Sequence, residues 1–209
     1  SPAKSLYRPH LSACELALLA FPHRARAKVC RFCWQAFFVA AQSDSRSHTL
    51  CMTELSPQYW LMKNEPDEYS IDHALNAPNQ CIAWTGVRNY QARNFMRDQM
   101  QVGDGVLYWH SSCAEPGIHG IARIAGNLRV DPTQFDPADP YYDPKSPPDK
   151  PRWLLVDVQA VKKTRYVSIA ELREHKALEN MRVLQRGNRL SITPVTPEEW
   201  HYIMDTLLK

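Results

Sequence analysis

The chain has 209 residues, of which 44% are hydrophobic and 22% are charged, values that are ordinary for a globular protein. No run approaches eighteen consecutive apolar residues, so the composition excludes a membrane-spanning helix. The net charge is only +3 and is unevenly placed: residues 1–51 hold seven Lys or Arg against two acids, whereas residues 52–209 hold 18 basic and 20 acidic residues. The body of the chain therefore lacks the basic excess that a broad electrostatic contact with duplex nucleic acid requires.

Residues 1–51 differ from the rest in composition and leave four interpretations open. The segment contains neither Met nor Gly and directly precedes Met52, so it could be a dispensable basic extension, disordered or translated from upstream of a native start. Its Arg-rich, acid-poor composition also fits a transit peptide. Cys30 and Cys33 form half of a zinc or redox motif, but no second pair follows at ligand spacing, so we expect no metal. Alternatively, the segment packs on the body through helices at 14–21 or 29–41.

The first structural signals of the body lie between residues 59 and 78. A strand is predicted over 59–65, ending before Pro66, and its alternation separates two faces. One face carries Trp60, Met62 and Asn64, and the other carries Leu61, Lys63 and Glu65. Ser70 is placed to cap a short helix that runs to about Leu75, and Pro78 closes that helix.

Residues 84–94, WTGVRNYQARN, are dense in aromatic, arginine and amide side chains and almost free of aliphatic ones. A core segment would show aliphatic residues at helical or strand period, so this stretch is more typical of the lining of a pocket. After a turn at Gly86 a helix follows, because apolar residues recur at helical spacing from Ala92 to Met100. Further strands are predicted over 106–110 and 117–126.

Residues 131–151 contain seven prolines, too many for a strand within a ladder. We predict an ordered or semi-ordered loop there, anchored by Tyr141 and Tyr142. Residues 153–161, rich in Val and Leu, predict a central strand. Capping boxes predict two more helices, at 168–178 and from Thr196 onward, with a short strand over 189–195 between them.

Several short strands with few long helices between them indicate an α+β fold around a small curved sheet, and not a doubly wound parallel sheet. The glycine signatures of phosphate-binding loops are missing from the sequence, so we expect no nucleotide cofactor. The body contains only Cys81 and Cys113, too few for a disulfide scaffold, so both are expected to be thiols.

Eight ordered motifs, from residue 59 to residue 200, resemble the EVE domain family: YWLMKNEPDEYSI, WTGVRNYQARNFMR, GDGVLYWHSS, PGIHGIARI, DPTQFDP, YYDPKS, PRWLLVDV and RLSITPVTPEEW. The resemblance implies that residues 52–209 form a PUA-like domain, a small mixed β-barrel flanked by short helices. It also implies a relation to the YTH readers of methylated adenine and to ASCH domains. Its implied partner is a modified base, methylated or hydroxymethylated, in DNA or RNA.

By analogy with YTH readers, the resemblance places the base site at Lys63, Asn64 and Trp84. A second cage aromatic is implied, with Trp153 the first candidate and Trp109 the second. Selectivity beyond a methyl contact needs buried polar groups that read the base edge, because an unpaired buried group costs ~1–3 kcal/mol. The candidates for this reading are Asn64, Asn89, Asn94 and Ser111, and the flanking phosphate is assigned to Lys63, Arg88 and Arg93.

Each of these residues also has a structural interpretation. Trp84 could be a core or rim residue, and Lys63 could form an ion pair with Glu65. Arg88 and Arg93 could pair with nearby acids. His110 and His119 are expected to pack on strands, because neither a nucleophile elbow nor metal-ligand spacing accompanies them.

The leading hypothesis is therefore a non-catalytic reader of a modified base, with no catalytic residues, metal or cofactor. The rival is an ASCH-like hydrolase of a modified nucleoside, in which Lys63 and Glu65 act as a base and its partner. A third hypothesis is an interaction module that docks a protein through Tyr141 and Tyr142. We expect the protein in the cytoplasm, or in the nucleus of a eukaryotic cell, and the sequence does not predict an oligomeric state.

Overall fold

The computed structural model describes residues 57–209. The interpretations of residues 1–51, including the cysteine pair and the two helices, lie outside the described residues. Within residues 57–209, the chain forms no helix that is both long enough and apolar enough to cross a membrane. Cys81 and Cys113 are free thiols, as the sequence predicts.

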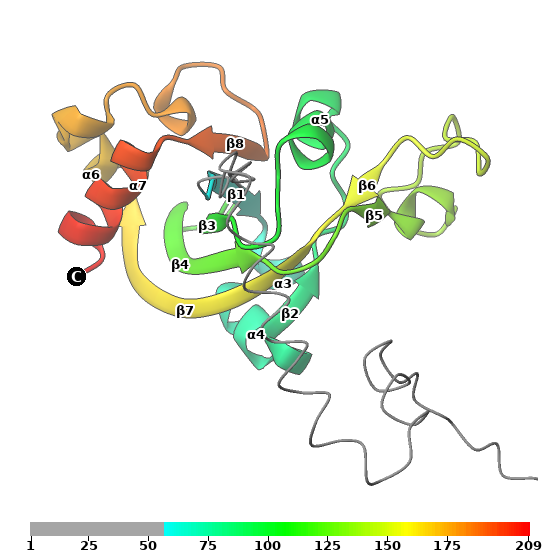
Figure 1. Cartoon of the computed structure of the whole chain (residues 1–209), viewed down its shortest axis with the longest axis horizontal. Coiled ribbons are helices and arrows are strands. Elements are labelled where there is room, and N and C mark those ends of the chain that lie inside the picture. The colour runs from blue at the N-terminus through cyan, green and yellow to red at the C-terminus, as the bar shows by residue number, and fades with distance from the viewer. Residues whose placement is uncertain (1–56) are drawn as a thin grey trace, which may run out of the picture. The chain divides into compact units, whose positions relative to one another are not determined.

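A six-stranded mixed sheet organises the domain, and its strands follow the order β2-β7-β4-β3-β1-β8 (Figure 1). The pair β1 and β3 is parallel, and the other neighbours are antiparallel. A second sheet contains only β5 and β6. The strands are β1 (Tyr59–Asn64), β2 (Cys81–Ala83), β3 (Gly105–His110), β4 (Gly117–Ile124), β5 (Arg129–Val130), β6 (Leu154–Leu155), β7 (Asp157–Ser168) and β8 (Ile192–Val195).

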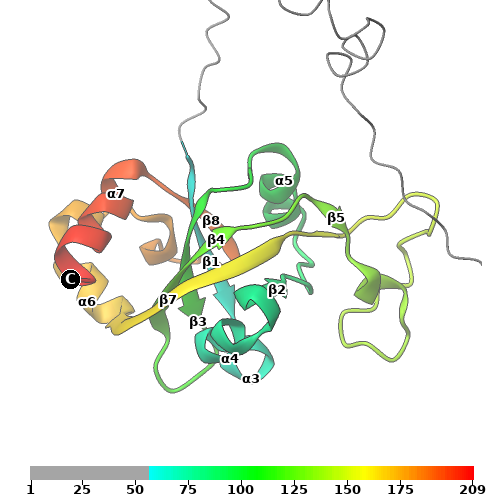
Figure 2. The same cartoon turned by 60° about the horizontal axis from the view of Figure 1, so that its bottom comes forward.

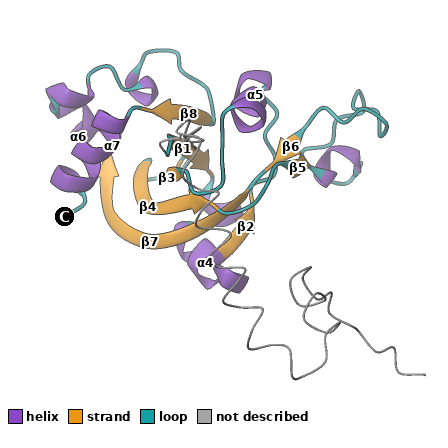
Figure 3. Cartoon of the chain, viewed as in Figure 1, coloured by secondary structure: helices purple, strands orange, loops and turns teal. Residues whose placement is uncertain are grey.

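Short helices surround this curved sheet (Figures 1 and 3). They are α3 (Pro66–Tyr69), α4 (Ile71–Asn76), α5 (Tyr90–Asp98), α6 (Ile169–Glu174) and α7 (Pro197–Tyr202), and α7 continues as a π-helix over Ile203–Leu207. Single 3₁₀ turns occur at Pro78–Gln80, Pro132–Phe135, Lys176–Leu178 and Arg182–Leu184. The predicted α+β class, a PUA-like mixed sheet with short flanking helices, is confirmed.

Alternation along β1, which the sequence predicts, and along β3 divides the core into two clusters. Trp60 and Met62 join one cluster with Tyr108, while Leu61 joins the other with Leu107. All five side chains are fully buried, so both faces of this parallel pair are covered. The parallel pair is therefore packed on both faces, and the carboxyl ends of its two strands lie at one well-supported edge of the sheet.

Several predicted helix starts follow from local chemistry. The hydroxyl of Ser70 accepts a hydrogen bond from the backbone N–H of His73, which caps α4. Thr196 and Glu199 form a reciprocal capping box at α7, with Pro197 at the first helical position. The helix predicted over 168–178 is shorter: α6 ends at Glu174 because the next residue, His175, is extended, and only a 3₁₀ turn follows.

The strand predicted over 153–161 is divided and extended. Its first part is β6, which pairs with β5, and its second part is β7, which runs on to Ser168. Figure 2 shows the length of β7, and Figure 1 shows its curvature. Register shifts against β4 accompany this curvature between Ile118 and Gly120 and between Ile121 and Ala122. The strand is internal to the sheet, between β2 and β4.

Candidate functional site

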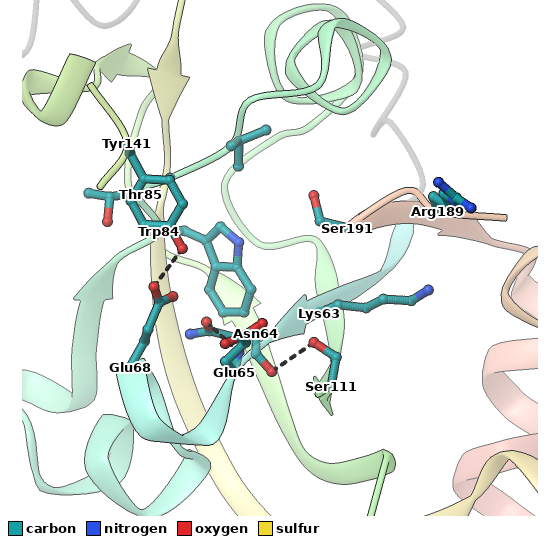
Figure 4. Close-up of a pocket in the computed structure, with 12 residues that line it drawn as sticks. Lys63, Asn64, Glu65, Glu68, Trp84, Thr85, Ser111, Tyr141, Arg189 and Ser191 are labelled. Carbon is teal, nitrogen blue, oxygen red and sulfur yellow. Dashed lines mark hydrogen bonds between the residues drawn. The ribbon is translucent and has the colours of Figure 1, made fainter. Parts of the chain in front are cut away.

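A cavity of about 310 Å³ opens where the parallel strands β1 and β3 end (Figure 4). Asn64 pairs with His110 at the end of this ladder, so the residues that follow both strands emerge at one edge of the sheet. Ser111 continues the ladder, since its backbone N–H donates to the carbonyl of Asn64 at 2.8 Å. On the other side of β1, the N–H of Lys63 donates to the carbonyl of Ser191 at 2.7 Å. Lys63, Asn64, Ser111 and Ser191 all line the cavity.

Two aromatic rings, those of Trp84 and Tyr141, form part of its wall (Figure 4). Trp84 follows β2 and is held by its backbone N–H, which donates to the carbonyl of Val156 at 2.9 Å. Its indole packs edge-on against Tyr108 with centroids 5.3 Å apart and is 5% exposed, so it is a core residue with one edge at the cavity. Tyr141 lies in the proline-rich loop and is only partly buried.

Gly86 allows Tyr141 to approach. Its φ of +78° favours glycine, and a Cβ at this position would lie 2.7 Å from ring carbons of Tyr141. The phenol of Tyr141 donates to the carboxylate of Glu68 at 2.5 Å, which ties the loop to α3. Burial, together with this hydrogen bond, raises the pKa of the Tyr141 phenol, so it stays protonated and remains a donor.

Arg88 fastens the proline-rich loop to the segment that carries Trp84. Its guanidinium donates to Asp131 at 2.8 Å, to Thr133 Oγ1 at 2.7 Å and to the carbonyl of Tyr141 at 2.7 Å. The Asp131 side chain is fully buried, whereas that of Arg88 is 20% exposed. Burial alone would raise the pKa of Asp131, but hydrogen bonds from Arg88, Thr133 and Gly86 outweigh it and lower that pKa.

The interior of the same loop is organised by Gln134, which is completely buried. Its amide nitrogen donates to the carbonyls of Asp131 and Trp153, and its amide oxygen accepts from Ser146, from the N–H of Arg152 and from the N–H of Trp153. The amide therefore joins both ends of the loop. This explains how a segment rich in proline holds Tyr141 in a fixed place.

The polar lining of the cavity carries both signs of charge, with Lys63, Glu65, Glu68 and Arg189 at its margin. Partial burial lowers the pKa of Lys63. In the described part of the chain, the Lys63 ammonium has no carboxylate within 4.0 Å, so the ion pair with Glu65 is not formed. Asn64 is engaged by the protein: its amide nitrogen donates to the carbonyl of Tyr69, and its oxygen accepts from the N–H of Glu65.

Four of the ten candidate site residues line this cavity: Lys63, Asn64, Trp84 and Ser111. Asn89, Arg93 and Asn94 instead shape α5. Asn89 caps the helix by accepting from the N–H groups of Gln91 and Ala92, and Arg93 donates to Asn94 and to the carbonyl of Arg152.

The other three candidates also lie away from the cavity. Arg88 is engaged by Asp131, in agreement with the structural interpretation that it pairs with an acid. Trp153 donates its indole N–H to Asp143. Its ring centroid lies 4.9 Å from that of Tyr90 and 5.6 Å from the guanidinium carbon of Arg88. Trp109 is buried in the cluster on the opposite face of β3 from Tyr108.

Sequence reasoning missed Tyr141, Glu68, Arg189 and Ser191 as lining residues. Tyr141 was expected as a loop anchor or as part of a loop that docks a protein, and nothing local marks Glu68 or Ser191. The motif YYDPKS could have marked Tyr141 as a lining residue. A tyrosine in a proline-rich loop has few helical or strand neighbours to pack against, so its ring is available to a cavity.

The two strand histidines stack on each other and pack on β3 and β4, with His110 and His119 centroids 4.1 Å apart and Tyr166 on the outer side of His119. The His110 Nε2 atom accepts a hydrogen bond from the N–H of Ile71 at 3.0 Å. Burial, and secondarily the neighbouring His119, lowers the pKa of His110 to about 4. His110 is therefore neutral at physiological pH and serves to hold the start of α4.

The curved mixed sheet, its short flanking helices and the cavity at the ends of the parallel strands define a PUA-like α+β domain. The chain belongs to the EVE domain family, whose model matches residues 58–206.

Among its relatives, human thymocyte nuclear protein 1 is 42% identical over 172 residues, which cover 74% of this chain and 75% of that protein. A crystal structure of a Pseudomonas putida protein is 47% identical with a TM-score of 0.67, covering 70% of this chain and 97% of that one. The structure of the human THYN1 protein in complex with 5-methylcytosine containing DNA is 42% identical with a TM-score of 0.67. The match covers 71% of this chain and 96% of that one.

Proposed function

We propose that this domain is a non-catalytic reader of a modified base in DNA, and that the base leaves its stack to enter the cavity between Trp84 and Tyr141. The observation that carries the proposal is the cavity itself, which is walled by two aromatic rings at a rigid sheet edge. Its volume of about 310 Å³ lies at the lower end of the ~300–1,000 Å³ range of ligand pockets, as suits one base and not a duplex. The relative solved with 5-methylcytosine containing DNA supports a methylated base as the ligand.

The energetics favour a site that combines rings with polar groups. Extruding a base costs a few kcal/mol, and contact with an aromatic residue returns ~1–3 kcal/mol per stacked base. Burying one methyl group contributes ~0.8 kcal/mol, which is roughly a fourfold preference. The methyl contact alone therefore gives weak selectivity, and polar groups at the cavity must supply the rest.

Lys63 and Glu65 are suited to read a cytosine edge. This edge offers a donor at N4 beside acceptors at N3 and O2, and a carboxylate is a natural acceptor for N4. The Lys63 ammonium supplies donors and has no carboxylate partner in the described part of the chain, and Glu65 supplies acceptors from an exposed position. Ser111 adds a hydroxyl whose lone pairs remain free to accept, since it donates its own proton to the carbonyl of Asn64.

A protein that reads DNA must work in the compartment that contains the DNA. The proposal therefore places this protein with the chromosomal DNA, which in a eukaryotic cell is in the nucleus. Recognition of RNA would need a contact to the 2′-hydroxyl, and a paired DNA and RNA titration distinguishes the two.

The test uses two fluorescently labelled DNA oligonucleotides that differ only in one 5-methyl group, titrated by anisotropy. Wild-type protein is expected to bind the methylated strand more tightly. Trp84→Leu should weaken that binding by about 5- to 150-fold, since it removes ~1–3 kcal/mol of aromatic contact. Trp200→Leu is the matched control: Trp200 stacks on Tyr59 near the C-terminus and does not line the cavity.

A second pair of variants keeps the test valid if Trp84→Leu unfolds. Tyr141→Leu removes the partly exposed ring, and Tyr142→Leu changes the neighbouring tyrosine, which lies outside the cavity. Tyr141→Leu should weaken binding while Tyr142→Leu should not. Equal affinities of folded wild-type, Trp84→Leu and Tyr141→Leu proteins for the methylated strand would contradict the proposal.

A further inference from the structure

A second groove, of about 460 Å³, adjoins the base cavity and carries three arginines. Arg182, Arg186 and Arg189 line it, and Arg189 also lines the base cavity, so this residue belongs to both. Residues 180–195 contain no acidic residue. In the part of the chain that the structure describes, none of the three arginines forms an ion pair, and all three are exposed.

Local hydrogen bonds hold the backbone that carries these arginines. Asn188 donates its amide to the carbonyl of Arg182 at 2.7 Å and accepts from the N–H of Leu190 at 3.0 Å. Gly187, just before Asn188, has a φ of +84° and so supplies a left-handed turn. Arg182 lies over the ring of Phe95 at 5.7 Å, which holds it against α5. An ordered basic groove loses less conformational entropy on binding an anion than a flexible tail does.

The basic residues predicted from the sequence are engaged elsewhere. Arg88 binds Asp131, and Arg93 binds Asn94 and the carbonyl of Arg152. The phosphates on either side of an extruded base must nevertheless meet cations, because phosphate contacts fix the register of a nucleic-acid strand. The groove shares Arg189 with the base cavity, so its guanidinium groups, which are unpaired within residues 57–209, lie beside that cavity.

We propose that Arg182, Arg186 and Arg189 bind the phosphates of the DNA strand that flank the base held in the cavity. This inference rests on the proposed base-reading function and adds the path of the strand to it. Guanidinium groups suit this ligand, since each can bind a phosphate through two parallel N–H donors. The strand then runs from the base cavity past Arg189 and along the loop between the Arg182–Leu184 turn and β8.

The test measures binding of methylated and unmethylated oligonucleotides over a series of salt concentrations. The variant Arg182→Gln/Arg186→Gln/Arg189→Gln should lose at least tenfold in affinity at low salt for both strands. Its plot of log affinity against log salt should be shallower by about 2 to 3, because each of the three lost phosphate contacts removes ~0.7–0.9 from the slope. The preference for the methylated strand should stay unchanged.

The matched control is Arg123→Gln/Arg129→Gln/Arg173→Gln, which removes the same charge from exposed arginines outside both cavities. It should keep the wild-type slope. If the first triple variant also keeps the wild-type slope and affinity while the methyl preference persists, the groove assignment is wrong and the base-reading proposal stands. If the wild-type protein shows no methyl preference, the base-reading proposal fails, as does the strand path that depends on it. Tighter binding of an acidic peptide of equal charge would also overturn the assignment.

Discussion

Replacing Arg88 with methionine should destabilise the domain, because it leaves the carboxylate of Asp131 buried without its cation. Asp131 has no exposed side-chain surface, whereas the aliphatic part of Arg88 can be replaced by a methionine of similar length. Removing one partner of a buried ion pair costs ~3–5 kcal/mol. Asp131 still accepts from Gly86, from the N–H of Thr133 and from its hydroxyl, so we expect the lower end, about 3 kcal/mol.

The assay is urea unfolding of wild-type, Arg88→Met, Asp131→Asn and the double variant at pH 7. The double variant should be more stable than the sum of the single losses predicts, by a coupling of ~1–3 kcal/mol. The folded state lowers the pKa of Asp131 below its usual 3.8, so the stability from the charged carboxylate is present above pH 3.8 and is lost as pH falls through the lowered pKa. The difference in free energy of unfolding between wild type and Arg88→Met should therefore become smaller over that acid range.

Additive losses in the double variant would refute this reasoning, as would an Arg88→Met protein as stable as wild type. Either result would mean that the proline-rich loop is held mainly by other contacts, such as those of Gln134.

Two further predictions concern the wall of the cavity and the strand histidines. Gly86→Ala should cost more than ~1 kcal/mol of stability and weaken binding of methylated DNA, because it combines a positive φ with a clash against Tyr141. The control Gly103→Ala should lose stability only, because Gly103 has a φ of +100° but no atom within 4 Å of the added Cβ. Denaturation measures the stability of both variants, and anisotropy measures their binding. The free energy of unfolding should fall as pH drops from 6.5 toward 4, by up to ~1.4 kcal/mol per pH unit, because the pKa of His110 is about 4 in the folded state and the unfolded chain takes up the proton first. His110→Asn should flatten this slope relative to His201→Gln, an exposed control, and an unchanged slope would show that His110 is not its source.

Elements set by neighbouring residues were predictable from the sequence. The cap at Ser70, the capping box at Thr196 and the alternation along β1 depend on side chains within a few positions of one another. The extent of β7 was not predictable in the same way. Its bend depends on register shifts against β4 that only the assembled sheet determines.

The candidate site was predictable only where it lies on β1, β3 and the residues after β2. Lys63, Asn64, Trp84 and Ser111 belong to those segments and line the cavity. Tyr141 and Arg189 reach it from loops whose path depends on long-range contacts, such as that of Arg88 with Asp131, 43 residues away in the sequence. Arg88 itself was assigned to phosphate because its buried acid partner could not be identified from spacing.

A crystal structure of the protein with an oligonucleotide that carries one 5-methylcytosine tests the base-reading proposal most directly. We predict that the methylated base lies unstacked in the cavity, in contact with Trp84 and Tyr141, and that the adjoining phosphate lies at Arg189. A complex in which that base remains stacked in the DNA while the cavity holds no base would contradict the proposal.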